Sequence, residues 1–284
     1  MKSWNGKSRR RKPMKKRQKT AAALTAALLA AVVLNVSNKS ITVTEITVES
    51  EKIPPEFDGF TIMQISDLHN AEFGSGQSDI TEIINSDKPD AVAVTGDFID
   101  SRRTDVDKAL ELIDGLDEGI PVYYSTGNHE SRTDEFEKLE KGLLDRGVTV
   151  LRGEKSVIEK DGSCISIIGV DDPSFGGRVS DVISSLIDGN YTILLAHRPE
   201  LIDEYSQADL ALCGHAHGGQ IRLPFIGGVY APGQGFFPEY AEGKRVIGGT
   251  CLIISRGLGN SLFPFRINNP PELVKITLTC GNNT

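Results

Sequence analysis

Cysteine is scarce in this 284-residue chain, and the spacing of the cysteines argues against one kind of metal site. The four cysteines are Cys164, Cys213, Cys251 and Cys280, and no two of them have the C-x-x-C spacing of a structural zinc site. Three lie in apolar, strand-like runs, where cysteine behaves as a small buried hydrophobe. Spacing alone neither establishes nor excludes disulfides, so the four cysteines exclude only a zinc knot.

Acidic residues are absent from the first nineteen positions, and charge of either sign is absent from the next nineteen. Residues 1–19 hold ten Lys or Arg, whereas the rest of the chain carries 21 basic against 39 acidic side chains, a formal charge of −18. An uncharged run of this length is just sufficient for a helix across a hydrocarbon core of roughly 30 Å. A basic head before an apolar run is also typical of a secretory signal. We therefore expect a basic cytoplasmic tail at 1–19, a transmembrane anchor or export signal at 20–38, and the main domain at 39–284.

The flanks of the apolar run favour an uncleaved anchor over a cleaved signal. No small-x-small cleavage site stands around Asn35 to Asn38. The excess of positive charge before the run predicts that the tail stays in the cytoplasm and the body lies outside it, either at the cell membrane or exported to the cell wall. Ser8 to Lys12 resembles a twin-arginine export signal, but Pro13 and Met14 stand where apolar residues are usual.

Strand-like runs alternate with amphipathic helical segments from Ile41 onward, which predicts one α/β domain. Helices are expected near 79–85, 105–116 and 133–144. Further strand-like runs at 155–159, 164–170, 252–254 and 273–278 have fewer helices between them, and they predict a second, more antiparallel sheet packed on the first. A polar motif follows each of five apolar strands, expected at 60–65, 91–95, 122–125, 191–195 and 208–213. Because open α/β sheets gather their ligand-binding loops at the carboxyl ends of the strands, the five motifs should meet at one edge.

All five histidines of the chain lie inside these motifs, so none is left for ordinary structural use. The motifs are Asp67-Leu68-His69, Gly96-Asp97-Phe98-Ile99-Asp100, Gly127-Asn128-His129-Glu130, Ala196-His197-Arg198 and Gly214-His215-Ala216-His217. Taken singly, such a motif is accidental or a turn in most proteins. Taken together, they offer imidazole, carboxylate and carbonyl donors, which are suitable ligands for hard or borderline divalent cations. The set predicts a metal-dependent hydrolase.

Seven of these residues suffice for two cations. One ion would take Asp67, His69, Asp97 and His217, and the other would take Asp97, Asn128, His197 and His215. Asp97 would then bridge two ions at the separation of ~3.5–4 Å that two-metal hydrolases use. Two divalent cations against two carboxylates leave a positive centre that attracts an anion and acidifies a bridging water to hydroxide at neutral pH. A phosphate ester fits this chemistry.

Four further residues are expected to act on the substrate. His129 adjoins a predicted ligand and would donate a proton or a hydrogen bond to the leaving-group oxygen. Asp100 would hold the second nitrogen of His129, although an Asp after a strand is equally often only a helix cap. Arg198 and Arg222 are predicted to bind the phosphoester.

The five motifs, present in order, resemble those of the calcineurin-like metallophosphoesterases. The resemblance spans roughly 41–279. It implies a four-layer αββα sandwich of two mixed β-sheets flanked by helices, and a dinuclear centre of manganese, iron or zinc. It also implies hydrolysis of phosphomonoesters or phosphodiesters, with the seven ligands named above, Asp97 as the bridge and His129 as the catalytic residue.

Two details of the motifs refine this resemblance. The combination of His197 to Glu200 with Gly214 to Pro224, behind an export segment, resembles a bacterial branch of membrane-anchored or wall-associated phosphoesterases. That branch includes pyrophosphatases that cleave the lipid precursor UDP-2,3-diacylglucosamine. Protein phosphatases of the superfamily continue the second motif as Asp-Arg-Gly, whereas this chain reads Asp100-Ser101-Arg102-Arg103. Their phosphate-clamping arginine cannot be carried over, which argues against a protein phosphatase.

The sequence therefore predicts a phosphodiesterase or pyrophosphatase acting on a cell-envelope or lipid-linked phosphoester. The acidic body would repel nucleic acid, so no nucleic-acid binding is expected. Five aromatic residues after the last motif would either line an apolar substrate groove or cover the edge of the second sheet; these are Phe225, Tyr230, Phe236, Phe237 and Phe263. The alternative function is a catalytically silent metal-binding scaffold at the membrane, which loss of a ligand or of His129 would favour; none is lost.

Overall fold

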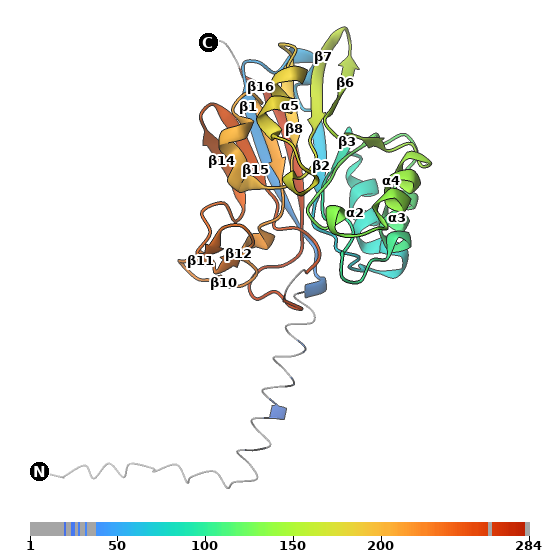
Figure 1. Ribbon diagram of the computed structural model, residues 1–284, viewed down its shortest axis with the longest axis vertical. Helices are drawn as coiled ribbons and strands as arrows, with labels where there is room; N and C mark the ends of the chain where they lie inside the picture. Colours follow the sequence, from blue (N-terminus) through green and yellow to red (C-terminus); the bar gives the residue numbers. More distant parts are fainter. Residues whose placement is uncertain are drawn as a thin grey trace, which may run out of the picture.

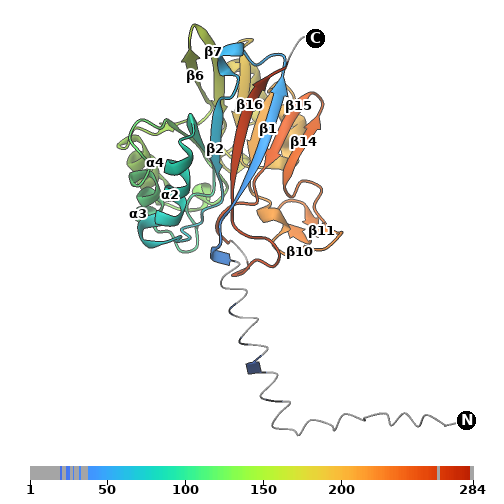
Figure 2. The same ribbon diagram turned by 180° about the vertical axis from the view of Figure 1, so that it is seen from behind.

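The computed structural model describes residues 38–260 and 263–281, together with residues 20, 24, 25, 28 and 32. Two six-stranded mixed sheets form its centre (Figures 1 and 2). The first sheet has the order β1-β16-β2-β3-β4-β5, and only the β16–β2 pair is antiparallel. Its strands are β1 (Thr42–Ser50), β2 (Thr61–Ile65), β3 (Ala91–Thr95), β4 (Val122–Ser125), β5 (Thr149–Val150) and β16 (Glu272–Cys280).

The second sheet has the order β14-β15-β9-β8-β7-β6. Its strands are β6 (Glu154–Lys160), β7 (Ser163–Gly169), β8 (Tyr191–Leu195), β9 (Leu210–Cys213), β14 (Gly243–Ile247) and β15 (Thr250–Ile254). Both edge pairs, β6–β7 and β14–β15, are antiparallel, and the inner pairs are parallel. The second sheet is therefore the more antiparallel of the two, and the prediction of two mixed sheets with helices is confirmed.

Helices cover the outer face of each sheet (Figure 1). On the first sheet, α2 (Ser78–Asp87), α3 (Val106–Asp114) and α4 (Phe136–Leu144) pack against Met63, Ile65, Val92 and Val94. The second sheet carries α5 (Val179–Leu186) and the 3-10 helix η5 (Pro199–Tyr205), neither of which the sequence analysis anticipated. The remaining 3-10 turns are η1 (Pro55–Phe57), η2 (Ser75–Gln77), η3 (Glu130–Arg132), η4 (Pro173–Phe175) and η6 (His217–Gly219).

The inner faces of the two sheets pack on each other through the alternate residues of each strand. Ala91 and Ala93 of β3 face the second sheet, whereas Val92 and Val94 face the helices. On the second sheet, Leu210 and Leu212 point inward and Ala211 points to the outer helices. Because both faces of the central strands are covered, these strands are continuously apolar rather than alternating, as parallel strands in α/β proteins are.

Two small hairpins follow the last motif and complete the end of the molecule where the motifs lie. They are formed by β10 (Arg222–Leu223) with β11 (Gly227–Gly228), and by β12 (Tyr230–Ala231) with β13 (Gly235–Phe236). In both views they lie at the same end of the domain as the start of β1 (Figures 1 and 2).

The predicted tail at 1–19 lies outside the described residues, and so does most of the segment predicted at 20–38. Among the residues that the structure describes, no helix combines the length and the apolar character needed to cross a membrane.

Candidate metal centre

Loops from both sheets converge on one edge of the molecule and are tied together there. Gln64, at the end of β2, donates from Nε2 to Thr95 Oγ1 of β3 (3.1 Å) and to the Cys213 carbonyl of β9 (2.9 Å). The backbone N–H of His215 donates to the Asp67 carboxylate at 3.1 Å, which joins the loops after β9 and β2. The carboxyl ends of strands from the two sheets thus form one surface.

The first group of predicted ligands consists of Asp67, His69 and His217. His217 Nε2 lies 3.5 Å from Asp67 Oδ1 and 3.3 Å from His69 Nε2. All three side chains are buried. Their donor atoms point at one another rather than at solvent, as the ligands of a single ion do.

The second group consists of Asp97, His197 and His215, and Asp97 connects it to the first. His197 Nε2 lies 3.2 Å from Asp97 Oδ2 and 3.1 Å from His215 Nδ1. The same Asp97 oxygen lies 3.5 Å from His69 Nε2. One carboxylate therefore stands between the two groups, where a bridging ligand would be needed.

The seventh predicted ligand, Asn128, adjoins the second group. One end of its carboxamide lies 2.8 Å from His215 Nδ1, and the other end lies 3.1 Å from Arg132 Nη1. Hydrogen bonding alone favours the amide nitrogen on the side of His215, whereas a cation held by His215 favours the oxygen. Asn128 is thus placed to join the second group in the orientation that a metal requires.

The backbone at the predicted ligands is unusual. Five of them have a positive φ, namely Asp67 (51°), His69 (47°), Asp97 (50°), His215 (66°) and His217 (48°). Left-handed conformations are uncommon for residues with a side chain, cost about 1–3 kcal/mol each and cluster at functional sites. Five such residues lie in one small region. This indicates that the loops bring these side chains together at the expense of low-energy backbone conformations.

Two motif glycines are required by close packing at the same place. A Cβ on Gly96, whose φ is +81°, would lie 2.4 Å from the backbone nitrogen of Gly127. A Cβ on Gly214 would lie 1.9 Å from Ser66 Oγ and 2.3 Å from Asp67 Oδ2. Since neither space admits a methyl group, these glycines bring the loops close enough for the ligands to meet.

The donor set fits divalent cations. Burial lowers the pKa of both His69 and His217 to about 3, so both rings are neutral at pH 7; their Nε2 atoms lie 3.3 Å apart, and with a cation between them both would offer lone pairs. Burial also holds the pKa of His215 well below its ordinary value. Lone pairs in such close contact repel each other unless a proton or a cation lies between them. Imidazole with carboxylate and amide oxygen suits manganese, iron or zinc.

His197 is held in the ring orientation that a metal ligand needs. Its Nδ1–H donates to the Thr95 carbonyl at 2.8 Å, which leaves Nε2 facing Asp97. Burial alone would lower the pKa of His197, but the adjacent Asp97 carboxylate outweighs it and raises the pKa to about 10. The site therefore attracts positive charge to this nitrogen. Hydrogen bonds of this kind fix the tautomer of metal-bound histidines.

His129 lies against the first group, with its ring centroid 4.5 Å from that of His69. Its Nδ1 accepts the backbone N–H of Ser101 at 3.1 Å, and Asp100 Oδ1 lies 3.3 Å from the same nitrogen. The Ser101 bond assigns the proton to Nε2, the nitrogen that can donate to a substrate. The structure thus places Asp100 beside His129, and it adds Ser101 as a partner that the sequence analysis did not name.

Glu130 is the connector of the second and third motifs, a role that the sequence analysis did not assign. Its carboxylate accepts the backbone N–H groups of Gly127 (2.8 Å), Asp97 (3.0 Å) and Phe98 (2.7 Å). Burial and the neighbouring Asp97 carboxylate raise the pKa of Glu130 to about 7. The clue in the sequence was an acidic residue directly after the Gly-Asn-His motif, where a side chain can fold back on its own turn.

Arg266 is a second residue that the sequence did not reveal. It is almost fully buried and donates to the carbonyls of Arg256 (2.7 Å) and Gly259, while Nη2 lies 3.4 Å from His217 Nδ1. Burial lowers its pKa to about 10, so it remains charged at pH 7. Within the described part of the chain no carboxylate pairs with it. Its charge therefore adds to the positive potential of the centre.

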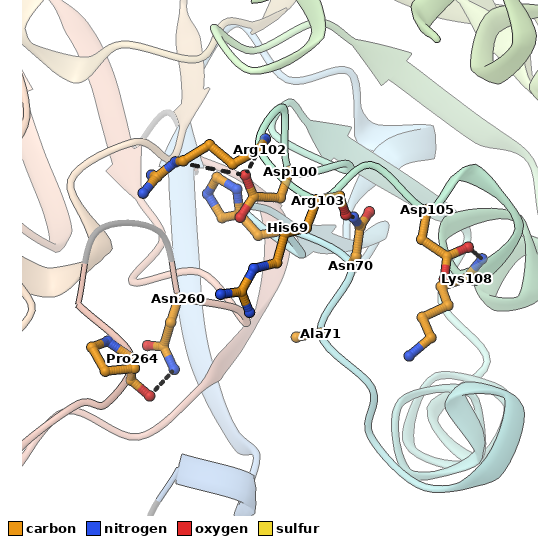
Figure 3. A pocket seen from close by; sticks show the side chains of 10 residues that line it. All are labelled: His69, Asn70, Ala71, Asp100, Arg102, Arg103, Asp105, Lys108, Asn260 and Pro264. Atoms are coloured by element: carbon orange, nitrogen blue, oxygen red, sulfur yellow. Dashed lines mark hydrogen bonds and ion pairs between the residues drawn. The ribbon is translucent and has the colours of Figure 1, made fainter. Parts of the chain in front are cut away.

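Two pockets open beside the centre. The smaller, of about 160 Å³, is lined by Asp97, Asn128, His129, Arg132 and Arg198, among others. The larger, of about 670 Å³, is lined by His69, Asp100 and three basic residues, Arg102, Arg103 and Lys108 (Figure 3). Arg102 lines both pockets. Figure 3 shows Arg102 and Arg103 extending from the loop that carries Asp100.

The two arginines predicted to bind substrate lie in different surroundings. Arg198 lines the smaller pocket and donates from Nε to the Asp172 carboxylate at 2.6 Å. Arg222 pairs with Glu242 and donates to the Gly218 carbonyl at 3.2 Å, so its charge is already compensated. Substrate binding by either remains a prediction. Arg102 and Arg132 are basic residues of the smaller pocket that the sequence analysis did not single out.

The residues of the centre match a known family. The family model described as calcineurin-like phosphoesterase matches residues 60–219, which contain all seven predicted ligands and His129. The chain belongs to the calcineurin-like phosphoesterase family. It is therefore a metallophosphoesterase, an enzyme class whose substrates are phosphoesters.

Three curated relatives illustrate the family. The chain is 34% identical over 250 residues to the metallophosphoesterase YkuE of Bacillus subtilis (strain 168), covering 85% of this chain and 87% of YkuE. It is 29% identical to the phosphodiesterase YaeI of Escherichia coli (strain K12), covering 77% and 82%. It is 25% identical to a transmembrane protein with a metallophosphoesterase domain from Danio rerio, covering 83% of this chain and 57% of that protein.

Proposed function

We propose that this metallophosphoesterase is a phosphodiesterase or pyrophosphatase with a dinuclear centre in a four-layer αββα sandwich. The observation that carries the proposal is the place of Asp97 between two groups of buried histidines. His69 and His197 approach the same Asp97 oxygen, at 3.5 and 3.2 Å. A carboxylate approached from two sides by separate ligand groups is the arrangement that two neighbouring cations require.

The seven predicted residues divide between the two cations. Asp67, His69, Asp97 and His217 would hold one ion, and Asp97, Asn128, His197 and His215 would hold the other. Manganese, iron or zinc bound there would supply the charge that attracts phosphoryl oxygens and would acidify water for attack at neutral pH.

The side chains around the ligands complete the reaction. His129 carries a proton on Nε2, because Nδ1 accepts the Ser101 N–H, and from Nε2 it would donate a hydrogen bond to the leaving-group oxygen. Asp100 Oδ1, 3.3 Å from Nδ1, would accept from that nitrogen when the ring is doubly protonated, and only in that form can Nε2 transfer its proton to the leaving group and leave a neutral ring. Arg102, Arg132 and Arg198 line the same pocket and bind the non-bridging phosphoryl oxygens, for which the guanidinium fork is suited.

We infer the substrate class from a proposed position of the chain at the membrane. The uncharged run of 20–38 behind ten basic residues supports an anchor with the catalytic domain of 39–284 on the extracytoplasmic side. A relative named as a transmembrane protein and another named as a phosphodiesterase are consistent with this placement and with diester cleavage. The substrate would therefore be a cell-envelope phosphoester, including lipid-linked ones, and the acidic domain disfavours nucleic acid.

Hydrolysis of bis-p-nitrophenyl phosphate by the manganese-loaded protein tests this proposal, with p-nitrophenyl phosphate as the monoester comparison. We expect turnover of the diester. His129→Ala should keep its metal and lose turnover by ~10²–10⁴-fold, the usual value of a general acid. Asp97→Asn should lose both metal and turnover.

Metal content measured on the same samples separates the alternatives. A correctly loaded wild-type protein without turnover on either ester, or on a panel of lipid-linked and nucleotide pyrophosphates, would be a metal-binding scaffold. Full occupancy of two ions in Asp97→Asn would refute the bridging role of Asp97.

A further inference from the structure

Large apolar side chains gather on the loops beside the metal centre. We call this surface the aromatic rim; it consists of Leu223, Phe225, Ile226, Phe236, Phe237, Phe263 and Phe265, all exposed. The relative exposure of Phe225 is 109%, that of Phe236 is 74% and that of Phe237 is 64%. Of the five aromatic residues that the sequence analysis named, Phe225, Phe236, Phe237 and Phe263 belong to this exposed set, whereas Tyr230 is half-buried. Exposed apolar clusters mark surfaces that bind a partner or a membrane.

The turn that contains Phe225 does not favour phenylalanine at this position. Ile226 N–H donates to the Leu223 carbonyl at 3.2 Å, which closes a turn with Pro224 and Phe225 at its centre. Phe225 has a φ of 67°, and a turn with Pro followed by a positive φ normally has glycine at that second position. A bulky aromatic residue there is strained. Something other than local folding must therefore favour phenylalanine.

The neighbouring hairpin supplies an internal comparison. Its turn is closed in the same way, by Gln234 N–H donating to the Ala231 carbonyl at 3.3 Å, around Pro232 and Gly233. Gly233 has a φ of 75°, close to that of Phe225, and is the residue expected for such a turn. Phe237, like Phe225, has a positive φ, of 55°. Within one chain, equivalent backbone positions thus carry glycine where the turn meets the centre and phenylalanine where it faces outward.

The β10–β11 and β12–β13 hairpins, which carry most of the aromatic rim, lie at the same end of the domain as the start of β1 (Figures 1 and 2). Ile267, next to Arg266, bridges to Ile221 at the base of the β10–β11 hairpin. Asn38, the last residue of the run, exchanges two hydrogen bonds with the Arg266 backbone, at 3.0 and 2.6 Å. The N-terminal segment therefore reaches the domain beside the rim, on the side of the centre.

The acidic residues of the chain are absent from the segments that carry the aromatic rim. The chain after residue 19 has a formal charge of −18, yet no Asp or Glu occurs between His215 and Pro238 or between Gly257 and Pro271. These two segments carry the whole rim. An acidic protein that approaches an anionic bilayer would need such a face without acidic side chains, because like charges at the contact are repelled.

We propose that the aromatic rim rests in the interface of a lipid bilayer, with Phe225, Phe236 and Phe237 inserted among the acyl chains. Aromatic side chains favour this region, where their apolar rings leave water while the backbone stays at the headgroups. The β12–β13 turn borders the smaller pocket, since Pro232 and Gly233 line it. The pocket then opens at the membrane surface, where the head of a lipid-linked phosphoester lies. This last step rests on the proposed function; the rim itself does not.

Tryptophan fluorescence in vesicles tests the contact directly. The chain has a single tryptophan, Trp4, so Trp4→Phe gives a silent background in which Phe225→Trp and Phe236→Trp report separately. Val157→Trp is the matched control, because Val157 is an exposed apolar residue on β6, at the opposite end of the domain (Figure 1). The full chain is reconstituted into phosphatidylcholine–phosphatidylglycerol vesicles with brominated acyl chains. We expect quenching of at least half the emission at 225 and 236, and less than a tenth at 157.

The outcomes are distinct. Emission at 225 and 236 as unaffected as at 157 would overturn the proposal, and so would a concentration-dependent dimer that Phe225→Gly abolishes, since the rim would then bind a second copy. Flotation with the same vesicles reports anchoring by 20–38 independently, so a chain that floats without quenching refutes the rim and leaves the anchor standing.

A thermal unfolding measurement tests whether the turn conformation disfavours Phe225. Phe225→Gly should leave the melting temperature unchanged or raise it, because the strained residue is replaced by the one the turn favours. It should also reduce quenching at Phe236→Trp. A fall in melting temperature of several degrees would mean that Phe225 is needed for folding, which contradicts the proposal.

Discussion

At the scale of single residues, the centre depends on burial that keeps imidazole neutral and on hydrogen bonds that choose its tautomer. The pKa of His69 and His217 falls to about 3 because both rings are buried, and this makes their nitrogens available to cations. Backbone N–H groups link Asp97, His129 and Glu130, because the Asp97 carboxylate accepts from His129 and the Glu130 carboxylate accepts from Asp97. Arg102, Arg132 and Arg198 line the smaller pocket, where we propose that they hold the phosphoryl group.

Arg102 is expected to bind the substrate, and its neighbour Arg103 serves as the control. Arg102→Ala should lower kcat/KM for bis-p-nitrophenyl phosphate about 10- to 100-fold, because a hydrogen bond to a charged group contributes roughly 1.5–3 kcal/mol. Arg103→Ala, which removes an equal charge from the larger pocket, should change it by less than about threefold at moderate salt. Steady-state kinetics and metal analysis of both variants check this. Equal losses in the two variants would mean that only the overall charge matters.

At the scale of elements, five strands end at the motifs that hold the predicted ligands, and three of these strands are followed by a sharp turn. Positive φ at Asp67, Asp97 and His215 turns the chain sharply at the carboxyl ends of β2, β3 and β9. Glycine then allows neighbouring loops to touch, as Gly96 does against Gly127. The stability of these turns is therefore a condition for metal binding.

A pair of glycine variants separates backbone strain from crowding. Gly59 has a φ of +79° and open space within 4 Å of where a Cβ would stand, whereas Gly96 has a φ of +81° and would place its Cβ 2.4 Å from Gly127 N. Gly59→Ala should cost about 1 kcal/mol from the left-handed conformation alone. Gly96→Ala should cost at least about 2 kcal/mol more and should lower metal affinity, because a clash with backbone cannot be relieved by a side-chain rotation. Urea unfolding and metal titration measure both, and similar losses in the two variants would contradict the crowding argument.

The loops after β7 and β8 are joined by an ion pair whose contribution depends on pH. Asp172 is buried and accepts from Arg198 Nε and Nη2 at 2.6 and 3.0 Å. Burial alone would raise the pKa of Asp172, but the Arg198 guanidinium outweighs it and holds the pKa below the ordinary 3.8. Because the folded pKa is the lower one, the stabilisation is fully present above pH 3.8 and is lost as the pH falls through the folded value.

Asp172→Asn should therefore lower the free energy of unfolding by about 1–3 kcal/mol at pH 7, and the difference from wild type should narrow below about pH 4. Urea unfolding in chelator at pH 7 and pH 3 tests this. Asp145→Asn is the control, since Asp145 pairs with Lys141 on an exposed helix surface and should contribute less than about 0.5 kcal/mol. A difference that persists unchanged at pH 3 would exclude the ion pair as its cause.

At the scale of the whole molecule, the centre lies where two sheets meet, so metal binding and folding are coupled. Ligands come from loops after β2, β3, β4, β8 and β9, and their closeness depends on the packing of one sheet on the other. Cations bound by both sheets should therefore hold the domain together. Removing them should loosen the interface between the sheets first at the edge that carries the ligands.

Chelation tests this coupling. At manganese concentrations 100-fold above Kd, binding stabilises the folded state by ~2.7 kcal/mol, which for a domain of this size raises the melting temperature by roughly 5–10 °C. Scanning calorimetry with EDTA, and again after manganese is restored, should show the fall and its reversal. Asp97→Asn should show little of either. If EDTA leaves the melting temperature of the wild-type protein unchanged, the cations do not hold the two sheets together.

The fold was predictable from the sequence to the extent that hydrophobic patterns are local. The strands 60–65, 91–95, 122–125 and 191–195 were all predicted from short apolar runs and lie within a residue of those observed. Helix boundaries were less accurate: the helix expected at 133–144 begins at Phe136, after a 3-10 turn at Glu130–Arg132. The α5 helix and the two small hairpins were missed, because short elements carry little periodic signal.

The class of reaction was predictable from the sequence, because folding does not alter the type and order of the donor residues. Histidine, aspartate and asparagine at strand ends determined that this protein handles divalent cations and phosphoesters. Tertiary structure alone decided which residues support them: Glu130 as a connector, Ser101 and Thr95 as partners of the histidines, Arg266 as a buried charge, and the exposure of Phe225, Phe236 and Phe237. These depend on which surfaces come together when two sheets pack, and a contact between distant segments leaves no pattern in either segment.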